Sequence, residues 1–220
     1  MPGYLTAVVA EALDPQAQAQ FWAAALGWRQ ADTVVRPNLP DSPALVFVPA
    51  ARPKTHKNRL HLDLAGAADP VAQKEAVQRL LDLGAAHADI GQRDTPWTVL
   101  ADPEGNEFCV LREPGADGHL VAVCQDAADV AAQRPFWQAA TGWSIADEGD
   151  WGVSLRLSGE DGELRGPRLV MGPPVTAKHG VNRWRFAVAT DTGSGRGLAP
   201  DRLGVRHTDP EGNEFHLIGG

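Results

Sequence analysis

Cysteine, methionine and tyrosine are scarce in this chain of 220 residues, and long apolar runs are absent. The two cysteines, Cys109 and Cys124, each lie in a strand-like apolar stretch, which argues against a disulfide framework. No stretch reaches the roughly 18 apolar residues of a membrane span. The first six residues lack the basic and then apolar order of a secretory signal. We therefore expect a cytoplasmic protein without a membrane partner.

Positive charge is also in short supply. Lys and Arg number 20 against 28 Asp and Glu, so the formal net charge is −8 at pH 7. An acidic protein lacks the phosphate-binding surface that nucleic acid requires, so no nucleic-acid partner is expected. The hydrophobic fraction of 43% is enough to bury an ordinary core.

Repetition is the most informative feature that is present. The seven residues Asp102–Phe108 recur letter for letter as Asp209–Phe215. Asp, Pro and Gly at the first, second and fourth positions favour a tight turn, and an alternating apolar segment follows each copy. Two identical copies about half a chain apart indicate a duplicated module.

The rest of the chain follows the same repeat. Further matched pairs are Phe21-Trp22 with Phe136-Trp137, Gly27-Trp28 with Gly142-Trp143, and Asn58-Arg59 with Asn182-Arg183. The first half predicts helices over 14–26 and 68–83, and strands over 4–9, 28–36, 44–48, 59–64, 88–90, 98–101 and 108–111. Each half therefore has the order of two βαβββ units. We expect modules over 1–113 and 119–220, joined by a linker over 114–118.

The second module is shorter. Roughly 17 residues are missing after Val188, and the Gly-rich segment 190–197 stands where the first module has its second helix. That helix is expected to be shortened or missing. The apolar face of Trp184, Phe186 and Val188 then needs cover, from the inserted loop 158–166 or from another subunit.

These motifs, seen twice and in the same order, resemble the vicinal oxygen chelate superfamily, which includes glyoxalases, bleomycin-resistance proteins and extradiol dioxygenases. The glyoxalase-like domain branch is the more similar part of it. The resemblance covers nearly the whole chain. It implies an α+β fold of two tandem modules, whose paired βαβββ units form curled mixed sheets with a concave cavity. It does not imply one reaction, because this fold carries several chemistries.

Metal-binding members of the superfamily hold the ion on the concave face, with ligands in the first and last strands of their units. Strand alternation predicts that His61, Asp63, Arg185, Cys109 and His216 face such cavities. The corresponding first-strand positions are the alanines Ala7 and Ala122. Grouped by module, Ala7 would join His61 and Cys109, and Ala122 would join Arg185 and His216.

Neither group offers the three ligands that a divalent metal usually takes. No cofactor is therefore expected, and a divalent metal at His61 and Cys109 is the alternative. His61, His216 and Arg185 are the candidates for acid–base catalysis.

Five residues are candidates for contact with a ligand. Trp97 and Trp151 lie where strands should reach the mouth of a cavity, and could stack on a planar group. Asp63 faces the cavity. Arg59 and Arg183 precede the cavity strands, and could anchor an anion or form structural salt bridges.

Three functions remain open. We expect a metal-free protein that binds a small molecule in its sheet cavity. The alternative is a lyase, isomerase or dioxygenase-type enzyme with a divalent metal near His61 and Cys109. A third is a scaffold whose own side chains fill its pockets. Either a monomer or a homodimer is compatible with the two modules.

Overall fold

The structure is a computed structural model that describes residues 3–92, 94–113, 119–190 and 198–219. The expected linker, 114–118, lies outside the described residues. The fold is α+β, with two mixed sheets and few helices. Of the helices in the described ranges, none is long and apolar enough to cross a membrane.

The described part of the first half contains ten elements. They are β1 (Tyr4–Ala12), α1 (Pro15–Leu26), β2 (Arg29–Ala31), β3 (Val34–Arg36), β4 (Ala44–Pro49), β5 (Leu60–Ala65), α2 (Pro70–Asp82), β6 (Ala86–His87), β7 (Thr98–Ala101) and β8 (Glu107–Leu111).

The described part of the second half contains β9 (Leu120–Asp126), α3 (Val130–Thr141), β10 (Ser144–Gly149), β11 (Gly152–Ser158), β12 (Leu164–Gly172), β13 (Trp184–Ala189), the 3-10 helix η2 (Pro200–Arg202), β14 (Val205–Thr208) and β15 (Glu214–Ile218).

Helices α1 and α3 begin and end by the same local chemistry. Asp14 accepts a hydrogen bond from Ala17 N at 3.0 Å, and Asp129 accepts one from Ala132 N at 3.0 Å. Gly27 and Gly142 then terminate the helices in the left-handed conformation, with φ of 64° and 70°. Repeated sequence has therefore produced repeated structure.

The single strand expected over 28–36 is wrong. The structure has a hairpin there, in which β2 and β3 pair antiparallel. Asp32 has a positive φ of 55°, a conformation that Asp tolerates better than most residues, and the chain turns at this point.

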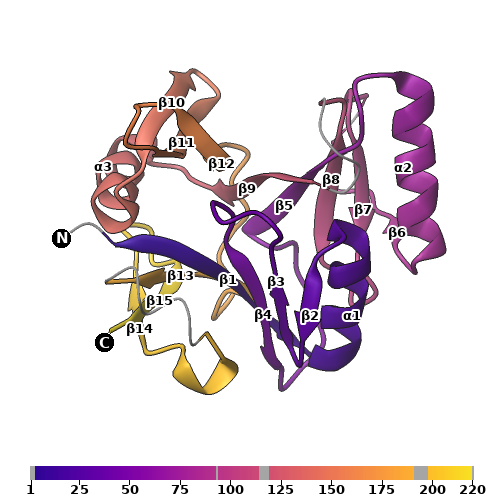
Figure 1. Ribbon diagram of the computed structural model, residues 1–220, viewed down its shortest axis with the longest axis horizontal. Coiled ribbons are helices and arrows are strands. Elements are labelled where there is room, and N and C mark those ends of the chain that lie inside the picture. Colours follow the sequence, from indigo (N-terminus) through magenta and orange to yellow (C-terminus); the bar gives the residue numbers. More distant parts are fainter. Residues whose placement is uncertain (1–2, 93, 114–118, 191–197, 220) are drawn as a thin grey trace.

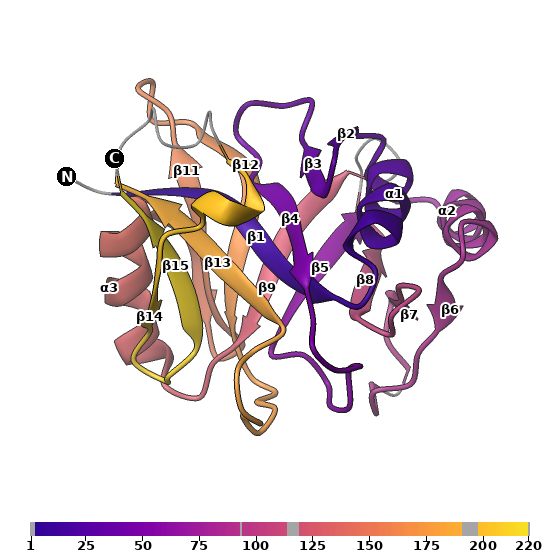
Figure 2. The same cartoon turned by 90° about the horizontal axis from the view of Figure 1, so that it is seen from below.

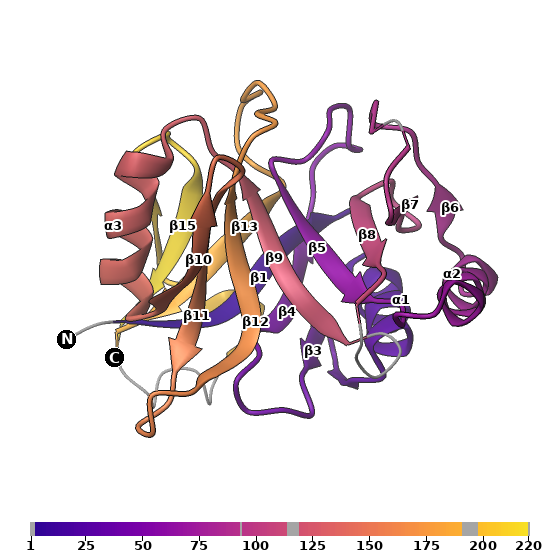
Figure 3. The same ribbon diagram turned by 90° about the horizontal axis from the view of Figure 1, so that it is seen from above.

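Both sheets combine strands from the two halves of the chain. Sheet A has the order β14-β15-β13-β1-β4-β3-β2, and sheet B has the order β10-β11-β12-β9-β5-β8-β7-β6. The antiparallel pairs β1–β13 and β5–β9 join the halves. Figure 2 presents sheet A toward the viewer, and Figure 3 presents sheet B.

This pairing corrects the grouping of cavity positions by module. Ala7 lies directly opposite Ala187 of β13, so it shares a sheet face with Arg185 and His216. Ala122 lies opposite Asp63 and shares a face with the cavity residues of β5 and β8. Each concave face thus takes one unit from each half, because the edges left open by β1 and β5 are completed by strands far away in sequence.

The main core lies between the two sheets and includes residues of α1, α2 and α3. The helices sit at the two ends of the molecule, with α3 on one side and α1 and α2 on the other (Figure 1). Trp184 of β13 contacts Trp22 of α1, with ring centroids 5.8 Å apart. Phe186 contacts Trp137 of α3 at 4.8 Å. The expectation that the inserted loop or another subunit covers this face is therefore wrong, since helices of the same chain cover it.

A second apolar cluster lies on the other face of sheet A. It contains Ala7, Val9 and Ala187 of the sheet, together with Leu198 and Leu203 beside η2. These two leucines fill the middle of the concave face, and the 3-10 helix lies beside β4. The concave face of sheet B has no such filling among the described residues, and a cavity is present there.

Candidate functional site

The concave face of sheet B lines a cavity of about 750 Å³. Its floor comes from β5, β8 and β9, whose side chains alternate between the core and the cavity. Leu60, Leu62 and Leu64 of β5 point into the core, as the alternation predicts, and His61 and Asp63 line the cavity. The volume is in the range of sites that hold a small organic molecule.

Four chemically active side chains meet on this floor. Asp63 lies directly across from Cys109 of β8, and His61 lies across from Cys124 of β9. The Cys124 thiol donates to Asp63 Oδ2 at 3.2 Å. His61 Nε2 lies 3.5 Å from Asp63 Oδ1, and that oxygen is buried without a hydrogen-bond partner.

Both thiols are held in the neutral form. Burial raises the pKa of Cys109, and the neighbouring Asp63 carboxylate raises it further. Burial and Asp63 also raise the pKa of Cys124 well above its ordinary value. Strand β5 separates the two cysteines, so their Cα atoms are about 10 Å apart, too far for a disulfide. The floor therefore carries one partly buried carboxylate among neutral thiols and an imidazole.

The residues present can be compared with the needs of a divalent metal. Ligand atoms of His61, Asp63 and Cys124 all lie within 4.8 Å of one another. Three mixed N, O and S donors facing an open cavity suit zinc, whose ligands in a tetrahedral site are about 3.3–3.8 Å apart. The unpartnered Oδ1 of Asp63 is a free donor for such an ion. The set fits, although binding would have to displace the Cys124 proton.

Sequence reasoning did not select Cys124. It placed the first-strand ligand position at Ala122, which has no donor atom. Cys124 is two residues further along the same strand, so it projects from the same face. Alternation along β9 indicates that Cys124 faces the same side as Ala122. Only the pairing of β9 with β5 brings it next to His61.

The rim of the cavity supplies aromatic and polar groups. Trp97 and Trp151 both line it and remain 39% and 44% exposed, so their faces are available to a ligand. Lys57 also lines it but is held by Asp126 at 3.2 Å and by Thr176 Oγ1 at 3.1 Å. Lys57 is therefore paired with Asp126 at the rim, while its charge also acts against the rise in the pKa of Cys109 on the floor.

Arg185 and His216 lie on sheet A, away from this cavity. Arg185 donates to Glu11 at 2.7 Å, and its Nε lies 3.4 Å from His216 Nε2. Burial and the charge of Arg185 lower the pKa of His216 to about 4. Both side chains are buried, at 4% and 7% exposure, so their arrangement offers little access to a substrate.

Arg59 and Arg183 occupy equivalent positions in structural ion pairs. Arg59 pairs with Glu211 at 2.7 Å, and Arg183 pairs with Glu104. Each glutamate belongs to the repeated turn of the opposite half and also accepts backbone N–H groups just before a helix. Both arginines line a surface pocket of about 370 Å³ on another part of the molecule.

Comparison with known proteins agrees with this geometry. Residues 7–111 match the family model of the glyoxalase-like domain. Glyoxalase I from Zea mays has a similar structure, with a TM-score of 0.60 and 14% identity, over 99% of this chain and 92% of that chain. A proposed dioxygenase from Bacillus subtilis subsp. subtilis str. 168 has a TM-score of 0.63 and 14% identity, over 100% of this chain and 86% of its own. Among curated proteins, no relative matches.

Proposed function

We propose that this chain, whose residues 7–111 match the glyoxalase-like domain model, binds a small organic molecule in the sheet B cavity without needing a metal. The observation that carries this proposal is the cavity itself. It has an apolar wall, two accessible tryptophans at its rim and, on its floor, the partly buried carboxylate of Asp63, whose Oδ1 has no hydrogen-bond partner.

The lining defines the kind of ligand. Trp97 and Trp151 favour a planar ring or an apolar body, because aromatic faces stack on such groups. Asp63 has an oxygen without a donor, and leaving it unpaired in a buried site is costly. The preferred ligand therefore has a planar part and a hydrogen-bond donor or a positive charge directed at Asp63.

Thermal-shift measurements with a panel of planar aromatic amines test the proposal. A binding amine should stabilise the protein, and Trp97→Ala or Asp63→Asn should each weaken binding about ten-fold, as expected for a stacked ring or a charge-assisted hydrogen bond. Leu13→Ala is the matched control, since Leu13 is an exposed apolar residue outside the cavity. Equal loss in the control variant, or no dependence on Asp63, would contradict the proposal.

A second candidate is a metal-dependent lyase, isomerase or dioxygenase-type enzyme. The observation that favours it is the meeting of His61, Asp63 and Cys124. These residues would hold the ion, with Cys109 beside them, and a bound divalent ion would polarise a substrate oxygen. His61 is then a ligand, and in the metal-free case it remains the candidate acid–base group.

Metal content separates the two candidates. Protein purified without chelator is analysed for zinc, cobalt, nickel, manganese and iron, beside the His61→Ala and Cys124→Ser variants. The metal-free proposal expects no stoichiometric metal in any of them. One ion per chain, lost in His61→Ala, would overturn it in favour of the enzyme.

A further inference from the structure

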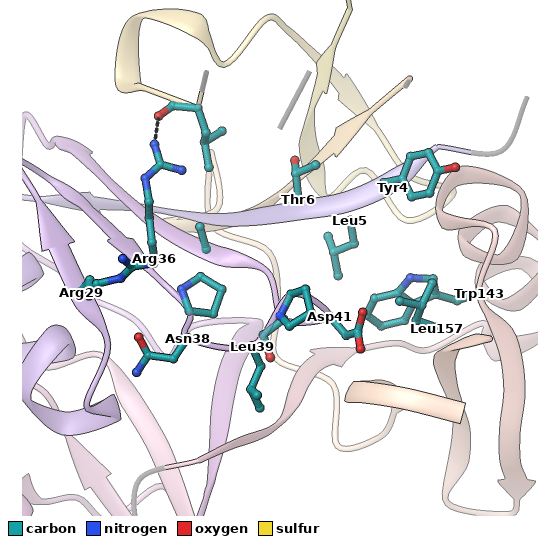
Figure 4. A pocket seen from close by; sticks show the side chains of 15 residues that line it. Tyr4, Leu5, Thr6, Arg29, Arg36, Asn38, Leu39, Asp41, Trp143 and Leu157 are labelled. Atoms are coloured by element: carbon teal, nitrogen blue, oxygen red, sulfur yellow. Dashed lines mark hydrogen bonds between the residues drawn. The ribbon is translucent and has the colours of Figure 1, made fainter. Parts of the chain in front are cut away.

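A third pocket lies at the edge of the filled face of sheet A, apart from the sheet B cavity and from the pocket at Arg59 and Arg183. It has a volume of about 530 Å³ and is formed by the start of β1, the loop between β3 and β4, and residues near α3 and β11. Figure 4 shows the side chains that line it. Nothing in the proposed function uses this pocket.

Two arginines mark one end of the pocket. Arg29 of β2 and Arg36 of β3 are direct cross-strand partners, so both side chains project from the same face. Like charges in that position repel each other. Arg36 donates one hydrogen bond to Leu198 O at 2.9 Å, and within the described ranges neither guanidinium forms an ion pair. Among the described residues, therefore, no anion compensates the pair.

The other end is lined mainly by apolar side chains. Trp143 and Leu157 lie there beside Tyr4, at the side of the pocket opposite the arginines (Figure 4). Leu39, which is 51% exposed, lies between the two ends. An amphipathic molecule would match this layout, with its charged group at the arginines and its apolar body toward Trp143.

One acidic group restricts the ligand further. Asp41 lines the pocket and lies near Trp143, away from the arginines (Figure 4). A ligand with a second carboxylate at its far end would meet this negative charge and be disfavoured. The two ends of the pocket thus differ in sign.

We propose that this pocket binds an organic monocarboxylate, whose carboxylate contacts Arg29 and Arg36 and whose apolar body lies against Leu39 and Trp143. Guanidinium groups suit a carboxylate because they present paired donors. Asp41 excludes the corresponding dicarboxylate. This site is independent of the sheet B cavity and of its ligand.

Titration with octanoate, followed by NMR at the Trp143 indole N–H and by calorimetry, tests the proposal. Octanoate should bind, octan-1-ol should bind at least about ten-fold more weakly, and octanedioate should also bind more weakly. The double variant Arg29→Gln/Arg36→Gln should lose about ten-fold in octanoate affinity, whereas Asp41→Asn should improve binding of octanedioate.

The control for the single variant Arg29→Gln is Arg134→Gln, which also removes one positive charge, from an exposed arginine paired with Glu148. The single variant Arg29→Gln keeps the test valid if the double variant fails to fold, because Arg29 is exposed on a short edge strand and its replacement should leave the fold intact. Equal affinity for octanoate and octan-1-ol, no effect of the arginine variants, or octanoate shifts confined to Trp97 and Trp151 would each overturn the proposal.

Discussion

Among single residues, burial decides what each titratable side chain can do. Strand alternation in the sequence predicts that His61 and His216 both face a cavity. In the structure, His61 lines an open cavity, whereas His216 lies against Arg185 and the backbone of Leu203 and Gly204. The alternation of the strands predicted the face, but not what would cover it.

His216 should make stability depend on pH. Its pKa is about 4 in the folded protein, below the ordinary 6.5, so the unfolded chain binds its proton first. The contribution is complete above pH 6.5 and is lost as the pH falls toward 4, by about 2–3 kcal/mol. Urea unfolding at pH 7.5 and 4.5 should show this loss in the free energy of unfolding. The His216→Gln variant should lose less stability between the two pH values, because the contribution of His216 is absent. The same pH dependence in the variant would contradict the assignment.

Among the elements, the repeated turn makes a set of hydrogen bonds that accounts for its identical sequence in the two halves. Asp102 accepts hydrogen bonds from the backbone N–H groups of Glu104 and Asn106, and from Trp22 Nε1 at 3.1 Å. Glu107, later in the motif, accepts from Lys54 and from Asn58 N. The motif therefore connects a turn, a helix and the start of β5.

Removing the turn carboxylate should be costly. Asp102→Ala leaves several buried donors without an acceptor, and we expect a loss of about 2–4 kcal/mol in the free energy of unfolding. Asp161→Ala is the control, because Asp161 accepts from Glu163 N in an exposed turn and should change stability far less. Chemical denaturation measures both, and similar losses in the two variants would argue against a structural role specific to the repeated turn.

For the whole molecule, the important fact is that neither half has a sheet of its own. Units β1–β4 and β5–β8 of the first half belong to different sheets, and each is completed by strands of the second half. We propose the modules 1–113 and 119–220 as units of duplication in the sequence and not as autonomous folding units. A single chain already supplies both partners, so we also propose a monomer.

Expression of the halves tests this. A fragment of residues 1–113 should be unfolded or should pair with a second copy, because two sheet edges are open in it. Mixing it with the fragment 119–220 should restore a one-to-one complex with native circular dichroism. A folded monomer of either fragment alone, seen by size-exclusion chromatography, would contradict the expectation.

The sequence by itself determined the duplication, the position of α1 and the faces of β5, because turns, caps and alternation act through neighbouring residues. Its repeated motifs also indicated the α+β fold, through their resemblance to a known family. Only the tertiary structure decided which units share a sheet, that Cys124 meets His61 and Asp63, and that Leu198 and Leu203 fill sheet A while sheet B keeps its cavity. Those outcomes depend on contacts between residues far apart in the chain. Local patterns specify the faces that must be buried, but not the partner that buries them.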